Sequence, residues 1–351
     1  MKMEDIAKLA QVSKSAVSLA LSGKPGIGPE TRERILQIAR DQGYTLKAKS
    51  QPADRSGRSL LFLVFSNSGI VLEKYYQQPF FRELIHFIEE RCRQKGYSLV
   101  FSSVDMESFD SDVQSIADEN QTSGVILLGT NLDRHSVESL ADKWPNLVVL
   151  DTCFETLPVH FLEINNVMGA YQAGTYLCDI GHREIGYVAS DVRIHNFDAR
   201  RRGFMASLAE RGLSVAEDHT FYVAPTILSS QEAMRKQLEG YIQEGGKLPT
   251  ALFCECDYIA ISAMKTLTEL GFRIPEDISV IGFDNISESV IVTPELTTIH
   301  VDKEQLARMA VDLLIDSIDG IRGVKIKTAV DTKFIERLSC SAPAVLSEAK
   351  A

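Results

Sequence analysis

Residues 1–44 read MKMEDIAKLAQVSKSAVSLALSGKPGIGPETRERILQIARDQGY, a pattern that predicts three short helices. Apolar residues between Ile6 and Ala10 form a stripe along the first helix, and a tight turn follows. Ser13 is a good N-cap for a second helix over residues 14–21. Two short helices joined by about three residues form a helix-turn-helix, whose second helix enters the major groove of DNA.

The second helix would carry the side chains that face DNA. Small polar side chains let a helix approach base edges, and Lys14 can reach a phosphate or a guanine. Leu19 can make only apolar contact, for instance with a thymine methyl group. We therefore expect DNA contacts from Ser13, Lys14, Ser15, Ala16, Ser18 and Leu19.

A third helix is predicted over residues 29–42, and the polar, basic stretch 45–59 that follows it is typical of a linker. Lys47 and Lys49 in this linker could contact phosphates as a flexible arm, because Pro52 would disturb a helix there. Helix spacing alone also fits a small helical cap packed on a larger domain, so that alternative stays open at this point.

The net charge of the chain is unevenly distributed. The 351 residues carry −11 overall, which by itself argues against nucleic-acid binding. Residues 1–58, however, contain 11 Lys and Arg against 6 Asp and Glu, a net +5, so that the remainder carries −16. A basic head on an acidic body suits a protein that presents only its head to DNA.

Length and composition indicate a soluble protein of two or three domains, with no membrane partner. The longest apolar run, residues 60–65, is far too short to span a bilayer. No signal peptide opens the chain, so we expect a cytoplasmic, nucleoid-associated protein. The close pair Cys254 and Cys256 lacks a companion pair at zinc spacing, so we expect reduced thiols, no metal and no cofactor.

From residue 60 onward, short apolar segments alternate with amphipathic helices, which predicts doubly wound parallel sheets. The number of segments favours two Rossmann-like lobes over one. Buried strands are expected over residues 60–65, 99–101, 125–128, 147–150, 185–188, 221–223, 252–254 and 280–283, and helices over 82–94, 199–210, 231–243 and 258–270.

Several motifs resemble one known family, the lactose-repressor/galactose-repressor (LacI/GalR) family of transcriptional regulators. In the head they are Asp-Ile-Ala at 5–7, Val-Ser-Lys-Ser-Ala-Val-Ser at 12–18, and Thr-Arg-Glu-Arg-Ile at 31–35 with Gly-Tyr at 43–44. In the body, residues 270–284, 294–299 and 336–340 continue the resemblance, which covers about residues 2–342.

The resemblance implies an all-α helix-turn-helix head, residues 1–44, then an α/β body of the periplasmic-binding-protein type. Its lobes would comprise residues 60–162 with 293–323 and residues 163–291 with 326–342, and 343–351 would be a tail. The chain would cross between the lobes three times and bind an effector in the cleft. This position agrees with the rule that open α/β sheets bind ligands at the carboxyl ends of their strands.

Candidate effector-binding residues follow from the strand ends and from the family pattern. Asp284 follows a strand and could accept two sugar hydroxyls, whereas an N-cap is the alternative. Arg200 matches the family's effector-binding arginine, and an aromatic ring suits the apolar face of a pyranose or a base, although Phe81 could also be core. The expected set is Phe80, Phe81, Asp151, Asn196, Arg200, Asp257 and Asp284, of which Asp257 could equally be a helix cap.

Two departures from the family lie on the DNA side. No leucine occupies the position in residues 45–52 that would wedge into the minor groove, so we expect little or no insertion there. Leu19 stands where an arginine often reads guanine, so the operator half-site should differ from the common one.

These observations predict a dimeric transcriptional regulator rather than an enzyme. We expect a repressor of carbohydrate-use genes that binds a near-palindromic operator and responds to a sugar or sugar derivative. The alternatives are a global regulator that responds to a protein partner, a sugar-metabolising enzyme with a DNA-binding head, and a transporter's solute-binding protein. The chain has no P-loop, no G-x-G-x-x-G after residues 60–65 and no G-x-S-x-G, which disfavours the enzyme.

Overall fold

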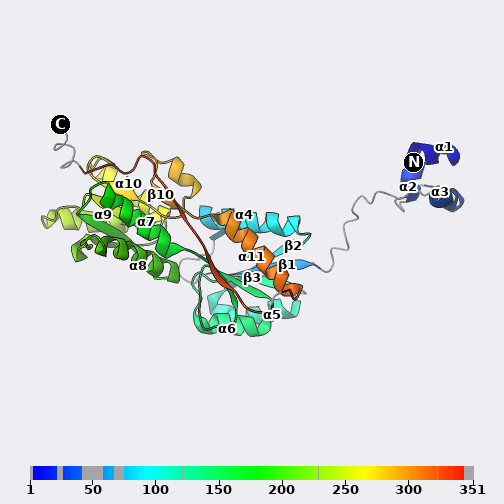
Figure 1. The fold of residues 1–351 in the computed structure, drawn as a ribbon, viewed down its shortest axis with the longest axis horizontal. Coiled ribbons are helices and arrows are strands. Elements are labelled where there is room, and N and C mark those ends of the chain that lie inside the picture. The colour runs from blue at the N-terminus through cyan, green and yellow to red at the C-terminus, as the bar shows by residue number, and fades with distance from the viewer. Residues whose placement is uncertain are drawn as a thin grey trace. The chain divides into compact units, whose positions relative to one another are not determined.

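The computed structural model describes residues 3–21, 27–41, 58–66, 75–119, 122–227, 229–321 and 323–343. The chain forms two compact units, residues 1–55 and residues 56–351 (Figure 1). Lys47, Lys49 and nearly all of the expected linker lie outside the described residues.

The first unit contains the three expected helices, α1 (Met3–Leu9), α2 (Lys14–Leu21) and α3 (Pro29–Asp41). Ile6, Val17 and Ile35, one from each helix, are fully buried against one another with four alanines. The Ser13 hydroxyl accepts a hydrogen bond from the backbone N–H of Ala16 at 3.2 Å, which confirms the predicted cap of α2. The expected end of α3 at Gln42 and Gly43 lies outside the described residues.

The second unit begins with a six-stranded parallel sheet in the order β11-β5-β4-β3-β1-β2. Helices α4 and α11 cover one face of this sheet, whereas α5 and α6 contribute to the core on the other. The elements are β1 (Ser59–Ser66), α4 (Pro79–Gln94), β2 (Ser98–Asp105), α5 (Phe109–Glu119), β3 (Gly124–Leu128), α6 (Arg134–Lys143), β4 (Leu147–Leu150), β5 (His160–Ile164), α11 (Lys303–Ile318) and β11 (Lys327–Val330).

Strand β1 explains why this sheet needs helices on both faces. Leu60, Phe62 and Val64 point into one apolar core, and the alternating residues Leu61, Leu63 and Phe65 point into the other. All six side chains are at most 1% exposed. A strand buried on both faces has no polar alternation, which is why its sequence is a continuous apolar run.

A four-stranded parallel sheet, in the order β7-β6-β8-β9, forms the centre of the second lobe. Helices α7 and α8 pack closely together, and α9 and α10 pack against each other (Figure 1). The elements are α7 (Asn166–Asp179), β6 (Ile185–Ser190), α8 (His195–Ala209), β7 (Thr220–Val223), α9 (Ser229–Gln243), β8 (Ala251–Cys254), α10 (Asp257–Glu269) and β9 (Ser279–Ile281).

Three connections join the two sheets. They follow β5, β10 (Thr298–His300) and β11, and the last one enters β12 (Lys333–Ile335), which pairs antiparallel with β10. The expected lobe boundaries need one correction, because β11 pairs with β5 in the first sheet although residues 326–342 were assigned to the second lobe. The alternating exposure of β11 is typical of a strand at the edge of a sheet, a weaker pattern than a continuous apolar run.

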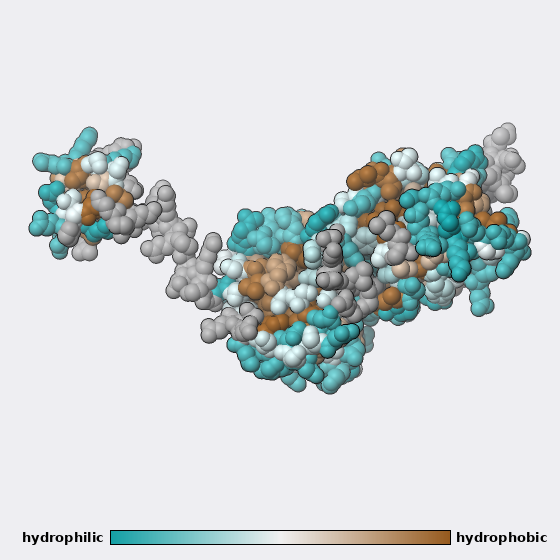
Figure 2. Space-filling view, turned by 180° about the vertical axis from the view of Figure 1, so that it is seen from behind, coloured by the Kyte–Doolittle hydropathy of each residue, from teal (hydrophilic) through white to brown (hydrophobic). Residues whose placement is uncertain are grey.

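The strand expected over residues 280–283 ends earlier, at Ile281. The backbone turns directly after it, since Asp284 and Asn285 have φ of 111° and 50°. Figure 2 shows a largely hydrophilic surface with scattered apolar patches, and the exposed apolar side chains include Phe101, Ile291 and Leu338.

Candidate functional site

The surface of α2 carries the side chains expected to face DNA. Ser13, Lys14 and Ser15 are exposed, and Ala16 and Leu19 are half-buried because the same helix packs on α1 and α3. The backbone of Ser18 lies within α2. The exposed side chains that the structure describes at the start of α2 are therefore polar, and the serines are small enough for a close approach to base edges.

A cavity of about 50 Å³ lies in the second unit, between the two sheets. Residues that follow β3, β4, β6 and β8 contribute to it, as expected for the carboxyl ends of parallel strands. Six of the seven expected effector residues line it; the lining residues are Gln78, Phe80, Phe81, Thr130, Asp151, Ile194, Asn196, Phe197, Arg200, Pro225, Cys256, Tyr258 and Asp284.

Asp151 and Asn196 meet across this cavity. Asn196 Nδ2 donates to Asp151 Oδ1 at 2.6 Å, and the hydroxyl of Thr130 donates to Asp151 Oδ2, also at 2.6 Å. Burial raises the pKa of the Asp151 carboxyl, while the two hydrogen bonds oppose that shift. Because Asp151 follows β4 and Asn196 lies in α8, this contact joins the two lobes.

The guanidinium of Arg200 organises the wall on the side of the second lobe. It donates to Asp284 Oδ1 at 2.9 Å, to Asn166 Oδ1 at 2.8 Å and to the carbonyl oxygen of Glu255 at 2.6 Å. The Cζ atom of this guanidinium also lies 3.7 Å from the ring centroid of Phe283. The arginine is thus held in one orientation by its hydrogen bonds to three acceptors and by stacking on an aromatic ring.

Asp284 is almost fully buried next to this arginine, with an exposed fraction of 6%. Burial raises the pKa of its carboxyl, and the charges of Arg200 and Lys303 oppose the shift. Lys303 Nζ donates to the backbone carbonyl of Asp284 at 3.2 Å and lies 3.2 Å from a carboxylate oxygen of Glu83. Lys303 therefore connects α11 and α4 of the first lobe to the loop that carries Asp284.

Aromatic side chains form the opposite wall. The rings of Phe80 and Phe81 meet edge to face, 5.5 Å apart. The backbone N–H of Phe80 donates to the hydroxyl oxygen of Tyr258 at 3.1 Å, so α4 and α10 are also joined here. Tyr258 was not among the expected site residues, although its position one residue after Asp257 in a helix beginning at a strand end could have indicated it.

Asp257 does not line the cavity, so its expected role in effector binding needs correction. Its carboxylate accepts hydrogen bonds from the hydroxyl of Thr298 at 2.6 Å and from the backbone N–H of Ile286 at 3.0 Å. Burial, together with the charge of Asp284, raises its pKa to about 8. Asp257 thus stabilises the loop that follows β9 through its contact with Ile286, on the side of that loop away from the cavity.

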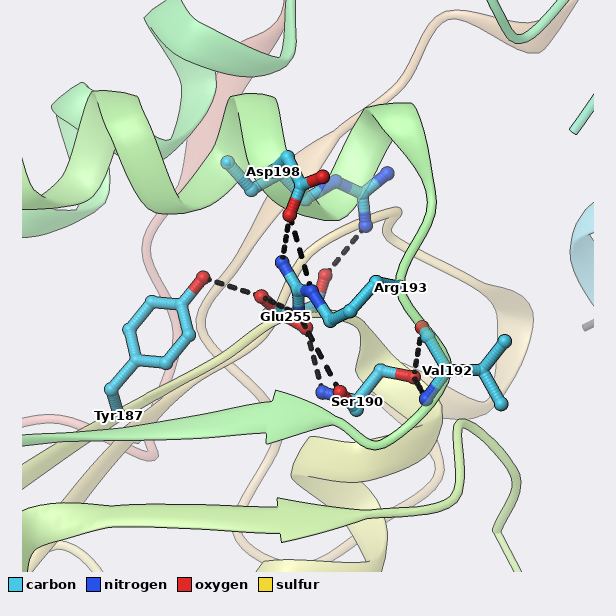
Figure 3. Close-up of polar contacts among 7 residues, drawn as sticks. Tyr187, Ser190, Val192, Arg193, Asp198 and Glu255 are labelled. Atoms are coloured by element: carbon cyan, nitrogen blue, oxygen red, sulfur yellow. Dashed lines mark hydrogen bonds and ion pairs between the residues drawn. The ribbon is translucent and has the colours of Figure 1, made fainter. Parts of the chain in front are cut away.

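Glu255 is a further functional candidate that the sequence did not reveal. Its side chain is completely buried and is surrounded by donors from β6 and from the loop after it (Figure 3). A single acidic residue between Cys254 and Cys256 gives no sign of such partners. All six cysteines are free thiols.

Comparisons with known proteins agree with this architecture. Residues 2–46 match the model of bacterial regulatory proteins of the lacI family, and residues 175–340 match a periplasmic binding protein-like domain. The HTH-type transcriptional repressor PurR of Pasteurella multocida is 30% identical over 321 residues, covering 90% of this chain and 92% of the relative. The ribose operon repressor of Haemophilus influenzae is 29% identical over 325 residues, covering 90% and 91%.

Solved structures show the same fold. The lac repressor dimer bound to operator and the anti-inducer ONPF has a TM-score of 0.71 at 22% identity, covering 97% of this chain and 99% of that chain. A complex of the transcriptional regulator CelR with cellobiose has a TM-score of 0.70 at 23% identity, with the same coverage.

A helix-turn-helix unit followed by a two-lobed body with a cavity between its sheets defines a DNA-binding regulator of transcription, not an enzyme. The chain belongs to the LacI family of bacterial regulatory proteins. Within the described residues, no helix is long and apolar enough to cross a bilayer. The same residues include no group of three or more His, Cys, Asp or Glu placed to hold a metal ion.

Proposed function

We propose that this protein represses carbohydrate-use genes and that a neutral, sugar-like effector in the cavity controls its affinity for DNA. The observation that carries the proposal is the buried pair Arg200–Asp284 in a cavity with aromatic walls. Carboxylate oxygens accept hydrogen bonds from sugar hydroxyls, and the faces of Phe80, Phe81 and Phe197 suit the apolar face of a sugar ring.

The charges favour a neutral effector over a phosphorylated one. Arg200 is the only cation among the described residues lining the cavity, and its donors already serve Asp284, Asn166 and Glu255. Asp151 and Asp284 contribute two carboxylates. A phosphate would therefore meet more negative than positive charge, whereas hydroxyl groups can donate to both carboxylates.

Relatives support a sugar as the ligand class. One solved family member, from Enterococcus faecium, holds bound ribose and another holds cellobiose. The cavity here has room for only a few water molecules, so a sugar would enter after the lobes move apart. The effector would shift DNA affinity through its different affinity for the two arrangements, typically by about 1–3 kcal/mol.

On the DNA side, we infer a dimer that places two copies of α2 on a near-palindromic operator. The basic head, the exposed Ser13, Lys14 and Ser15, and the lac repressor dimer bound to operator support this inference. The exposed Phe101, Ile291 and Leu338 are available for contact with a second copy. The protein would act at the nucleoid, in the cytoplasm.

The first test selects random duplex DNA with the full-length protein. Enrichment of a palindrome would support the operator and dimer inference, whereas enrichment of a single, unrepeated half-site would overturn it. The second test is calorimetry with D-ribose, cellobiose and D-ribose 5-phosphate. We expect heat from at least one neutral sugar that Asp284→Asn abolishes and Asp179→Asn, an exposed control, preserves. Binding of D-ribose 5-phosphate alone, or control of DNA affinity solely by a protein partner, would overturn the proposal of a neutral effector.

A further inference from the structure

Glu255 is a buried carboxylate that accepts four hydrogen bonds from three donor groups (Figure 3). Its Oε1 accepts from the hydroxyl of Tyr187 at 2.7 Å, and its Oε2 accepts from the backbone N–H of Ser190 at 2.6 Å. Arg193 Nη1 lies 2.8 and 2.7 Å from the two oxygens. Both carboxylate oxygens are therefore fully used by β6 and by the loop that follows it.

Arg193 also attaches this loop to helix α8. Its Nε and Nη2 donate to Asp198 Oδ1 in the first turn of α8, at 3.1 and 2.7 Å. Ser190 closes the start of the loop, since its hydroxyl donates to the carbonyl oxygen of Val192 at 2.8 Å. The segment between these anchors, residues 191–197, then delivers Ile194, Asn196 and Phe197 to the cavity.

The backbone of Glu255 also contacts a residue that lines the cavity. Its carbonyl oxygen accepts the 2.6 Å hydrogen bond from Arg200 Nη1, and the next residue, Cys256, lines the cavity. The residue that follows β8 thus contacts both the loop that leads into Asn196 of α8 and the arginine that pairs with Asp284.

Stability alone does not require such an arrangement. Burying a carboxylate costs free energy, and a buried ion pair can often be replaced by apolar side chains without loss. Burial raises the pKa of the Glu255 carboxyl, and Arg193 opposes this shift more than any other group. An apolar pair could not supply these directed hydrogen bonds. Through them Glu255 holds Ser190 and Arg193, and Arg193 in turn holds the first turn of α8.

We propose that Glu255 and Arg193 are positioning residues of the effector site, which hold residues 191–197 and Arg200 in the binding arrangement before an effector arrives. The inference rests on the proposed function, because it takes the cavity as the effector site. A side chain that must be newly ordered on binding costs about a factor of 2 to 12 in affinity. Releasing the loop should therefore weaken effector binding by about tenfold or more, because Asn196 and Phe197 would both have to be ordered.

The experiment uses hydrogen exchange, followed by mass spectrometry, on the full-length protein without any ligand. We expect Arg193→Met and Glu255→Gln to accelerate amide exchange in residues 190–200 while β1 stays protected. Arg273→Met is the matched control, because it makes the same exchange of side chains at an exposed ion pair with Asp277 and leaves the pair of Arg193 with Glu255 intact. Unchanged exchange in residues 190–200, or equal acceleration throughout the second lobe, would overturn the proposal.

A double variant separates positioning from simple stabilisation. Arg193→Met with Glu255→Gln removes both charges, and the amide can still accept from the Ser190 N–H and pair with the Tyr187 hydroxyl, so the resistance to urea should recover from that of Arg193→Met. Exchange in residues 190–200 should nevertheless remain fast, and calorimetry with D-ribose and cellobiose should show about tenfold weaker binding. Wild-type affinity in the double variant would overturn the proposal.

The two proposals fail in different ways. If the wild-type protein binds neither sugar, the sugar-effector function fails, and with it the claim that the pair serves a sugar site. Exchange confined to residues 190–200 would then still support the hold that Glu255 and Arg193 exert on the loop. If the wild-type protein binds a sugar but the variants exchange and bind like it, only the positioning role is overturned.

Discussion

Asn196 of α8 donates a 2.6 Å hydrogen bond to Asp151 at the end of β4, so a contact between two buried polar side chains joins the two lobes inside the cavity. Both side chains are at least nine-tenths buried. A ligand hydroxyl that enters the cavity would have to share these groups or replace their contact. The same two side chains therefore hold the lobes together and provide polar groups to the cavity.

Removing this contact should loosen the closed arrangement. We predict that Asn196→Ala lowers the free energy of unfolding by about 1–3 kcal/mol, because one oxygen of the buried Asp151 loses its donor. Urea unfolding measures the change, and small-angle X-ray scattering should show a larger radius of gyration. Asn146→Ala, whose side chain donates within the first lobe, should leave the radius unchanged.

Arg200 should be far more important for stability than an exposed arginine. Arg200→Met leaves Asp284, Asn166 and the Glu255 carbonyl without their donor, and we predict a loss of about 3–5 kcal/mol. Arg273→Met breaks the ion pair of an exposed arginine with Asp277 and should leave the free energy of unfolding nearly unchanged. Equal urea midpoints for the two variants would contradict this reading of the buried network.

The contact between His195 and Glu163 predicts a pH effect on stability. His195 Nε2 lies 2.6 Å from Glu163 Oε2, and this hydrogen bond raises the pKa of His195, whereas Arg202 lowers it and Asp151 raises it. Because the pKa is higher in the folded state, the stabilisation is complete below the unfolded value of 6.5 and is lost as the pH rises through the folded pKa.

Unfolding at about pH 5.5 and about pH 8.5 tests this prediction, since histidine changes charge between these values. His195→Gln should cost more stability at the acidic pH than at the basic one. Asn146→Ala, which removes no titrating group, should cost the same at both pH values. A cost of His195→Gln that grows with pH would refute the assigned direction.

Two glycines should respond to alanine in opposite directions. A Cβ at Gly203 would lie 2.1 Å from the carbonyl oxygen of Val167, so α7 and α8 would have to separate. We predict a loss of about 1–3 kcal/mol for Gly203→Ala. A Cβ at Gly240, inside α9, meets nothing within 4 Å, so Gly240→Ala should stabilise the protein by about 0.5–1 kcal/mol in thermal unfolding.

The exposed start of α2 yields a prediction for DNA binding. Lys14→Ala should weaken binding to all sequences and reduce the slope of log affinity against log salt by about 2, because each of the two heads in the dimer loses one phosphate contact. Lys265→Ala, on α10, serves as the control and should leave the slope unchanged. A change of preferred bases with an unchanged slope would instead assign Lys14 to base recognition.

The sequence predicts the strands that are buried on both faces, because Leu60 and its neighbours form unbroken apolar runs. It also predicts which side chains gather at one cavity, since Asp151 and Asp284 each follow a strand, one in each sheet, and ligands bind at the carboxyl ends of such strands. Their part in binding an effector stays a prediction.

Other features depend on contacts between distant residues. Asp257 and Asp284 both follow strands, but Thr298 and Ile286 draw the Asp257 carboxylate away from the cavity. The role of Glu255 depends on Arg193, 62 positions earlier in the chain. No local pattern encodes either arrangement, because each arises only when separate segments meet in the folded lobe.

The position of β11 has a consequence for biosynthesis. Residues 327–330 complete the first sheet by pairing with residues 161–164 of β5, so the first lobe includes strands from both halves of the chain. During translation, the edge of β5 stays unpaired until nearly the whole chain has left the ribosome, at about 5–20 residues per second. An unpaired edge is open to other strands, which makes the nascent first lobe a natural client for chaperones.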